Sequence, residues 1–196
     1  MLLNYDPDSA VYLIGSGVVA DECRFHLNRD GATNIIQLEY NKWDKIPDGS
    51  QCVIGFQNCF NKQRILTASR INQYRWPTYI HPSAVVEDTG SLGSGCWIGS
   101  LANISVNSIV GDFSVITSYS NIAHGCQLGR NNFLAPSTII CGSVTTGDNI
   151  SFGAGSIIKD HITIGSNIEF IMDSVVTKDI PGSGRYYGNR RIPQCL

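Results

Sequence analysis

Residues 98 to 127 read IGSLAN, ISVNSI, VGDFSV, ITSYSN and IAHGCQ, five consecutive hexads that each begin with an aliphatic residue. The same frame runs from Ile80 to Val176, where sixteen of the seventeen positions are apolar and Thr146 is the exception. A helix would repeat every ~3.6 residues, and a hairpin sheet would alternate over longer runs. The hexads therefore predict a parallel β-helix, in which the apolar residue of each short strand stacks inside a prism.

Residues 10 to 76 have a different pattern. AVYLIGSG reads as a strand that runs into Gly15-Ser16-Gly17, and VVADECRFHLNRDG reads as a helix that ends at Gly31. Two more strands, TNIIQLEY and QCVIGF, precede a second helix, NKQRILTASRINQY. This order predicts a small parallel α/β domain of Rossmann type over residues 1–76, followed by the β-helix over residues 77–196.

The glycines after the first strand suggest a ligand at the start of the following helix. Gly15 and Gly17 would allow close approach to the helix N-terminus, where backbone N–H groups bind anions. The full GxGxxG motif is absent because Ala20 stands at the third glycine position, although alanine is tolerated there. The alternative is a tight turn from strand to helix without a ligand.

Composition excludes several classes of protein. The 196 residues include 14 Lys and Arg against 16 Asp and Glu, so the chain lacks the basic excess that nucleic acids and anionic membranes require. The N-terminus has no secretory pattern, and no apolar run reaches the ~18 residues of a membrane span. The seven cysteines show no CxxC pairing, so we expect reduced thiols and a cytoplasmic protein.

The whole order of segments resembles a family of bacterial hexapeptide-repeat enzymes, the sugar O-acyltransferases and nucleotide-aminosugar N-acetyltransferases, which include sialic acid O-acetyltransferases. The residues that carry this resemblance are the Gly15-Ser16-Gly17 opening, Val53-Ile54-Gly55 with Arg64 after it, the Ile80-His81-Pro82-Ser83-Ala84 junction, the hexads, and VVTKDIP at residues 175 to 181. The resemblance implies a left-handed β-helix of eighteen residues per coil, with five to six coils. It also implies acetyl-coenzyme A as donor, a nucleotide sugar as acceptor, and a homotrimer with active sites between neighbouring prisms.

The catalytic histidine of the family falls on His124 in NIAHGC. An imidazole titrates near neutral pH and can take a proton from the acceptor amine or hydroxyl. His124 is the third residue of its hexad, so we expect it to point outward. One coil later stands Gly142, whose N–H the resemblance assigns to the oxyanion, and a glycine lets the thioester approach. A solvated histidine on a turn is the alternative.

The sequence departs from the family directly after this histidine. Members usually carry a glutamate or aspartate that orients the imidazole, and here the residue is Gly125. A base without an orienting partner is a weaker base. Thr117, Asn121, Asp112 or a backbone carbonyl are candidate substitutes.

The resemblance also suggests residues for the two substrates. Small residues one coil beyond Gly142 would lie against the pantetheine arm, with turn geometry as the alternative: Gly153, Ala154, Gly155 and Ser156. Basic residues near the C-terminus would bind the phosphates of coenzyme A, with a solvated tail as the alternative: Lys178, Arg185, Arg190 and Arg191. The nucleotide sugar is expected at Gly15, Ser16, Gly17, Glu39 and Arg64. No metal is expected, because the spacings of His81, His124 and His161 share no register.

These observations predict an acetyl-coenzyme A dependent N-acetyltransferase that acts on a nucleotide-linked amino sugar in bacterial surface-glycan biosynthesis. One alternative is a sugar O-acetyltransferase with the same machinery. A hydroxyl is harder to deprotonate than an amine, so the missing carboxylate at Gly125 favours nitrogen. Another alternative is a non-catalytic trimer that binds a nucleotide sugar.

Overall fold

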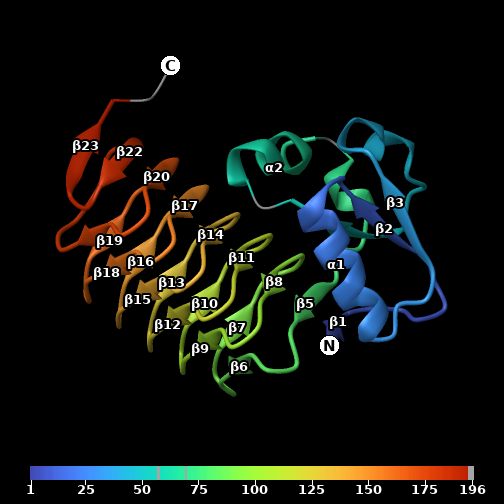
Figure 1. Cartoon of the computed structure of the whole chain (residues 1–196), viewed down its shortest axis with the longest axis horizontal. Helices are drawn as coiled ribbons and strands as arrows, with labels where there is room; N and C mark the ends of the chain where they lie inside the picture. Colours follow the sequence, from blue (N-terminus) through green and yellow to red (C-terminus); the bar gives the residue numbers. More distant parts are fainter. Residues whose placement is uncertain (57, 69, 194–196) are drawn as a thin grey trace.

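A computed structural model describes residues 1–56, 58–68 and 70–193 of the chain. A prism of short parallel strands forms one end of the molecule, and a smaller part with two α-helices covers one side of its N-terminal coils (Figure 1). The parallel β-helix predicted from the hexads is therefore present.

Three sheets form the sides of the prism. The long sheet has the order β1 (Leu2–Leu3), β5 (Thr78–Ile80), β8 (Trp97–Ile98), β11 (Val115–Ile116), β14 (Phe133–Leu134), β17 (Ile150–Phe152), β20 (Ile168–Phe170), β22 (Gly184–Tyr187) and β23 (Arg190–Ile192). The six-stranded sheet contains β6 (Val85–Val86), β9 (Asn103–Ile104), β12 (Asn121–Ile122), β15 (Ile139–Ile140), β18 (Ile157–Ile158) and β21 (Val175–Val176). The five-stranded sheet contains β7 (Ser91–Leu92), β10 (Ile109–Val110), β13 (Gln127–Leu128), β16 (Thr145–Thr146) and β19 (Thr163–Ile164).

The register of these sheets gives the length of a coil. Ile109 pairs with Gln127, and Asn121 pairs with Ile139, so each strand lies beside the strand eighteen residues further on. Coils of eighteen residues are therefore confirmed, and the six-stranded sheet receives one strand from each of six coils. Neighbouring coils lie ~4.8 Å apart, the spacing of hydrogen-bonded strands.

The prism has three corners, which we name by the sheets they join. The first corner leads from the long sheet to the six-stranded sheet, as at residues 117–120 and 135–138. The second corner leads from the six-stranded to the five-stranded sheet, as at residues 123–126 and 141–144. The third corner returns to the long sheet.

The apolar residues of the hexads form the core of the prism. From Ile98 to Val176 each of these apolar side chains is at most 3% exposed. The polar exception, Thr146, is also buried, and its hydroxyl accepts a hydrogen bond of 3.1 Å from Asn132 Nδ2. Asn132 also caps the carbonyls of Gly129 and Gly147, each at 3.0 Å. The polar atoms inside this coil are thus paired, as buried polar groups require.

The smaller part is built on a three-stranded parallel sheet. Its order is β3 (Ile35–Leu38), β2 (Val11–Ile14), β4 (Gln51–Ile54), with helices α1 (Val18–Arg29) and α2 (Cys59–Leu66) and 3-10 turns η1 (Tyr40–Lys45) and η2 (Ile71–Gln73). The second helix was predicted to continue through NKQRILTASRINQY, but α2 ends at Leu66. The described residues contain only this small α/β part, and a Rossmann-like domain is not evident in them. Three strands are too few for the doubly wound sheet of that fold.

Aromatic packing joins the small part to the long sheet. Tyr79 and Trp97 stack with ring centroids 4.0 Å apart, and Tyr79 belongs to the same apolar cluster as Leu13 and Leu27. At the third corner Asn131 Nδ2 donates to the carbonyl of Cys59 in α2 at 2.8 Å. The two parts therefore share a core and have little freedom to separate.

The cysteines of the described residues carry free thiols, and all except Cys141 are buried. Cys195 lies outside the described residues. None of the helices in the described part of the chain combines the length and apolar character that crossing a membrane requires.

Candidate functional site

His124 and Gly142 lie against each other at the second corner of the prism. His124 is exposed in the turn between β12 and β13, and Gly142 occupies the same position one coil later. A Cβ built on Gly142 would lie 2.7 Å from Cε1 and 2.8 Å from Nε2 of His124. Such distances are far below van der Waals contact, so the imidazole can occupy this place only because residue 142 has no side chain.

The backbone at this corner leaves the N–H of Gly142 without an acceptor in the described part of the chain. Within the described residues the N–H of Gly142 donates no hydrogen bond, whereas those of Cys141 and Ser143 donate to Ile158 and His124 at 3.0 and 2.9 Å. Because Gly142 has no Cβ, a carbonyl oxygen can approach its N–H closely. A preorganised donor of this kind can stabilise the negative charge that develops on an oxyanion.

The side chains suggested as substitutes for the missing carboxylate bond elsewhere. Thr117 donates to the carbonyl of Leu134 at 2.7 Å, and Asn121 accepts from Asn103 at 2.9 Å. Asp112 accepts from the N–H of Ser94 at 2.8 Å. Across the described part of a single chain, no group is hydrogen-bonded to the imidazole of His124.

Gly125 adopts the left-handed conformation, with φ of 69°. The same corner position carries Asn107, Ser143 and His161 in other coils, with φ between 58° and 59°. A Cβ at Gly125 would meet only Ser143 Oγ, at 3.4 Å. This turn therefore accepts a side chain, and the absence of a carboxylate is not forced by the backbone.

Cys126, two residues after His124, is a packing residue. Its side chain is fully buried, and Sγ contacts the carbonyl of Cys141 at 3.1 Å. Burial raises the pKa of its thiol, which disfavours the nucleophilic thiolate.

The small residues expected one coil beyond Gly142 lie at another corner. Gly153, Ala154 and Gly155 belong to the first corner, between β17 and β18, and the residue one coil beyond Gly142 is Asp160. A Cβ at Gly153 would clash with the backbone of Met172 in the next coil, and Gly155 has φ of 70°. The expected placement was wrong because these residues follow Gly142 by less than one coil, and turn geometry accounts for both glycines.

The basic residues expected at coenzyme A separate into two places. Lys178 is exposed at the second corner, two coils beyond Gly142. The hairpin of β22 and β23 turns beside it, since Asn189 bonds the N–H and hydroxyl of Thr177 at 2.9 and 2.7 Å, and exposed Arg190 follows. Arg191 instead lines a cavity of about 830 Å³ with Phe60, Glu169 and Arg185.

A pocket of about 340 Å³ lies at the start of α1. Three of the residues expected to bind the nucleotide sugar, Gly15, Ser16 and Arg64, line it together. Gly15 has φ of 132°, and a Cβ there would lie 3.2 Å from the ring of Phe56. We call this the glycine-loop pocket; its remaining lining residues are Tyr40, Phe56, Asn58 and Asn61.

Gly17 and Glu39 lie next to this pocket without lining it. Gly17 precedes α1 with φ of 87°, and Glu39 follows β3 directly and is exposed. Tyr40 and Phe56, whose rings meet edge to face at 5.8 Å, were missed by sequence reasoning. The available signal was their position, because each follows the end of a parallel strand, where ligands of α/β sheets bind.

No three His, Cys, Asp or Glu side chains converge as metal ligands would in the described ranges.

Comparisons with known proteins give one match to a curated sequence, and no family model matches the chain. The chain is 34% identical over 88 residues to GDP-perosamine N-acetyltransferase of Escherichia coli O157:H7. The match covers 45% of the chain, and the chain spans about 40% of the length of this relative.

The fold is shared with solved structures along nearly the whole chain. A mutant of perosamine N-acetyltransferase from Caulobacter crescentus, in complex with CoA and GDP-perosamine, has a TM-score of 0.81, 21% identity and coverage of 94% of each chain. The acetyltransferase domain of PglB from Neisseria gonorrhoeae, in complex with acetyl coenzyme A, has a TM-score of 0.77, 20% identity and coverage of 94% and 98%. WeeI from Acinetobacter baumannii has a TM-score of 0.80 and 19% identity, with coverage of 94% and 99%. The resemblance stated from the sequence is thereby confirmed at the level of fold.

Proposed function

We propose that the chain transfers an acetyl group from acetyl-coenzyme A to the amine of a nucleotide-linked amino sugar in bacterial surface-glycan biosynthesis. The observation that carries the proposal is the packing of the His124 imidazole on Gly142. The sequence match to an N-acetyltransferase of a GDP-linked sugar supports an amine as acceptor.

His124 and Gly142 have separate tasks in this reaction. As the amine forms its bond to the thioester carbon, His124 takes the proton that the nitrogen loses. The N–H of Gly142 stabilises the negative charge on the carbonyl oxygen. When the carbon–sulfur bond breaks, the imidazolium returns the proton to sulfur, so the products are an acetamide and a thiol.

The coenzyme is assigned to the second corner. Gly142 would bind near its thioester, and Lys178, two coils and ~10 Å further along this corner, would meet its phosphates. Arg190 joins Lys178 in this role because the Asn189 contacts hold the hairpin turn against Thr177. Arg191, which lines the separate cavity beside α2, is not part of this group.

We assign the nucleotide to the glycine-loop pocket. The first turn of α1 offers free backbone N–H groups and a favourable dipole to a diphosphate, and Arg64 adds a forked donor. Ser16 would contact the diphosphate, Gly17 would permit its approach, and Glu39 would accept from a ribose hydroxyl. In this proposal residues 1–76 act as a Rossmann-like nucleotide-binding domain on a left-handed β-helix of residues 77–196.

The assembly in the proposal is a homotrimer. The outer face of the six-stranded sheet exposes a short aliphatic row at Ile139, Ile157 and Val175, on successive strands and between 38% and 53% exposed. Exposed Val85 is separated from this row by Asn103 and Asn121. An apolar row on a water-facing sheet favours contact between copies. In the trimer the first corner of a neighbouring copy would place Gly153, Ala154 and Gly155 beside the pantetheine arm.

The test is thiol release from acetyl-coenzyme A on a panel of GDP, UDP and dTDP amino sugars. We expect turnover on one amino sugar and a loss of at least ~100-fold in kcat for His124→Ala. Lys45→Ala is the control, because Lys45 is exposed in η1 and lines neither the glycine-loop pocket nor the second corner, so kcat should stay unchanged. Turnover only with the corresponding sugars that carry a hydroxyl in place of the amine would identify the protein as an O-acetyltransferase. Nucleotide-sugar binding without any turnover would indicate the non-catalytic trimer.

A further inference from the structure

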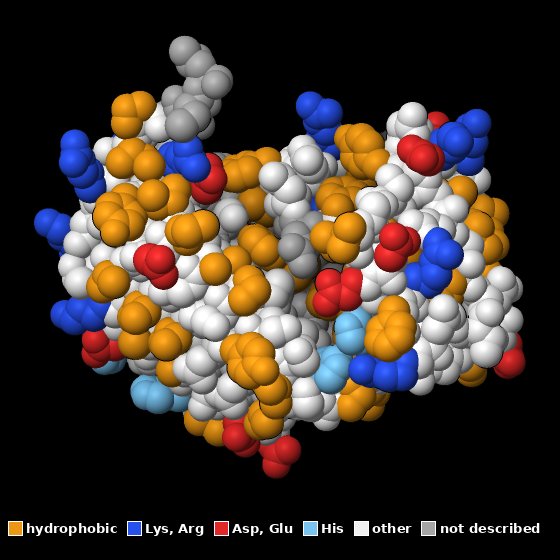
Figure 2. All heavy atoms as spheres, in the orientation of Figure 1, with side chains coloured by type: hydrophobic (Ala, Val, Ile, Leu, Met, Phe, Trp, Pro, Cys, Tyr) orange, Lys and Arg blue, Asp and Glu red, His pale blue; other side chains and the backbone are white. Residues whose placement is uncertain are grey.

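A cleft between α1 and the prism brings together two histidines that are distant in the sequence. The rings of His26, in α1, and His81, after β5, meet edge to face with centroids 5.3 Å apart. The cavity has a volume of about 160 Å³, and the stacked pair Tyr79 and Trp97 lines it. Figure 2 shows histidine side chains at the boundary between the two parts, where this face of the molecule is hollowed. We call this the histidine cleft.

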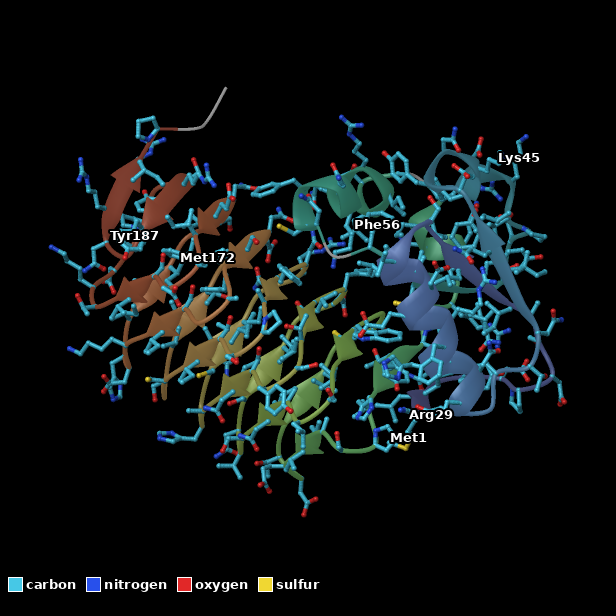
Figure 3. All side chains as sticks on the ribbon, in the orientation of Figure 1. Met1, Arg29, Lys45, Phe56, Met172 and Tyr187 are labelled. Carbon is cyan, nitrogen blue, oxygen red and sulfur yellow. The ribbon has the colours of Figure 1, made fainter. Side chains whose placement is uncertain are left out.

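The histidine cleft adjoins the glycine-loop pocket. Phe56 lines both, and Figure 3 shows it beside the first turn of α1, with Arg29 at the other end of the helix. On the prism side the cleft is bounded by the first corner, at Ser100, Ser118 and Pro136. A ligand in the glycine-loop pocket can therefore extend past Phe56 along α1.

His81 is already committed to structural contacts. Arg29 Nη1 lies 3.1 Å from His81 Nε2, and His81 Nδ1 lies 2.8 Å from Ser83 Oγ and accepts from the Ser83 N–H at 3.1 Å, so both ring nitrogens have partners within the chain. Burial, together with Arg29 and His26, lowers the pKa of His81 and keeps it neutral. This imidazole forms a fixed wall of the cleft.

His26 is largely buried with one ring nitrogen unpaired, and the exposed carboxylate of Glu22 stands beside it at the edge of the cleft. His26 Nε2 lies 3.8 Å from Glu22 Oε1, which is too long for a hydrogen bond. His26 Nδ1 is buried, and nothing in the described residues bonds to it. A buried polar atom without a partner destabilises the fold, so its retention calls for an explanation outside the packing of a single chain.

We propose that the histidine cleft holds the sugar ring of the nucleotide sugar, with Glu22 and His26 binding its hydroxyl groups and Trp97 packing on its apolar edge. This inference rests on the proposed function. The cleft is smaller than the ~300 Å³ at which sites for whole ligands begin, so it suits one moiety, while the adjoining glycine-loop pocket suits the nucleotide. Aromatic walls with few polar groups match a ring that is apolar at its edge and hydroxylated around it.

Glu22 and His26 thereby determine specificity for the sugar. A site built to bond a hydroxyl rejects an analogue that lacks it, because a buried group, here the ring of His26, is then left without a partner. The cleft should therefore discriminate among different sugars attached to the same nucleotide. It should not affect the affinity for the nucleotide without a sugar.

The test compares binding of the nucleotide sugar with binding of its nucleoside diphosphate by calorimetry, for the wild type, Glu22→Ala and His26→Ala. We expect each substitution to raise the Kd of the nucleotide sugar by about 10- to 100-fold. The Kd of the nucleoside diphosphate and the KM of acetyl-coenzyme A should stay unchanged. Asn28→Ala is the control, since Asn28 is exposed on α1 beyond its first turn and does not line the cleft.

Equal affinities of the variants and the wild type for the nucleotide sugar would overturn the assignment of the cleft. Equal weakening of the diphosphate would also overturn it, because the residues would then serve the nucleotide. The binding comparison needs no turnover. Failure of the proposed transferase function would be detected in a different experiment, as the absence of thiol release by the wild-type protein with every sugar of the panel.

Discussion

At the scale of single residues, the contact between His124 and Gly142 is the most demanding feature of the candidate site. A methyl group at residue 142 would overlap the imidazole at 2.7 Å. Either the ring or the backbone N–H must then move, and a displacement of about 1 Å at a reacting group can cost on the order of 100-fold in rate.

We expect Gly142→Ala to lower kcat on the order of 100-fold while the melting temperature changes little, because the corner is only half-buried. Thiol release and thermal unfolding measured on the same preparation check this. Gly182→Ala is the control, since a Cβ there meets nothing closer than the Tyr186 hydroxyl at 3.4 Å. A variant with full activity would show that the imidazole does not need its observed place.

Gly125 allows a complementary gain of function. A carboxylate there would accept a hydrogen bond from the imidazole and stabilise the imidazolium that forms when His124 takes the proton. We expect Gly125→Asp to raise kcat several-fold relative to Gly125→Asn. Both variants carry the same cost of a side chain at positive φ, about 1 kcal/mol. Equal kcat values for the pair would indicate that residue 125 does not reach the base.

Sequence reasoning could locate His124 and Gly142 because both depend on a repeat. A period of eighteen residues fixes which residues stack at a corner, whatever the rest of the chain does. It could not find the pairing of His26 with His81, because α1 reaches the prism only through packing between segments with no common period. Counting one period of eighteen residues from Gly142 gives Asp160, so Gly153 belongs to a different corner.

At the scale of elements, the hexads predicted the inward position of each strand in the prism, because one buried apolar side chain in every six leaves a single inward frame. The second helix was less predictable. It stops at Leu66 because the following residues turn back to pair Arg75 with Gln51, a long-range contact that helix propensity does not encode. Tertiary pairing decided the boundary there.

Helix α2 is fastened to the prism by a buried lysine. Lys62 is 1% exposed, and its ammonium donates to the carbonyl of Phe113 at 2.5 Å. Burial lowers its pKa to about 8, with Cys59 and Cys96 opposing the shift. Between pH 8 and 10.5 Lys62 is therefore mainly protonated in the unfolded chain and mainly neutral in the folded one. Because the unfolded state binds more protons in this range, the contribution of Lys62 to stability rises with pH.

We expect the wild type to gain about 1 kcal/mol in unfolding free energy relative to Lys62→Met between pH 7 and 9. Denaturant unfolding of both proteins at each pH measures this difference. The buried thiols, whose raised pKa values act in the opposite direction above pH 9, are common to both proteins and cancel. A difference that is constant with pH would mean that Lys62 titrates normally.

At the scale of the whole molecule, the two halves of the proposed site lie on different sides of one chain. The histidine cleft opens at the first corner and His124 stands at the second, with the six-stranded sheet between them. A sugar in the cleft of one copy must therefore meet His124 of another. The aliphatic row on that sheet offers the surface through which two copies can come together.

Mixed assemblies test this division. Chains with His124→Ala lack the base, and chains with Glu22→Ala and His26→Ala lack the cleft, so we expect each to be nearly inactive alone. Co-expressed, they should regain thiol release, because some interfaces then join an intact cleft to an intact His124. The control mixes His124→Ala with Gly142→Ala, which damage the same corner and should restore nothing. If mass spectrometry shows mixed oligomers and the first pair stays inactive, both halves of the site belong to one chain.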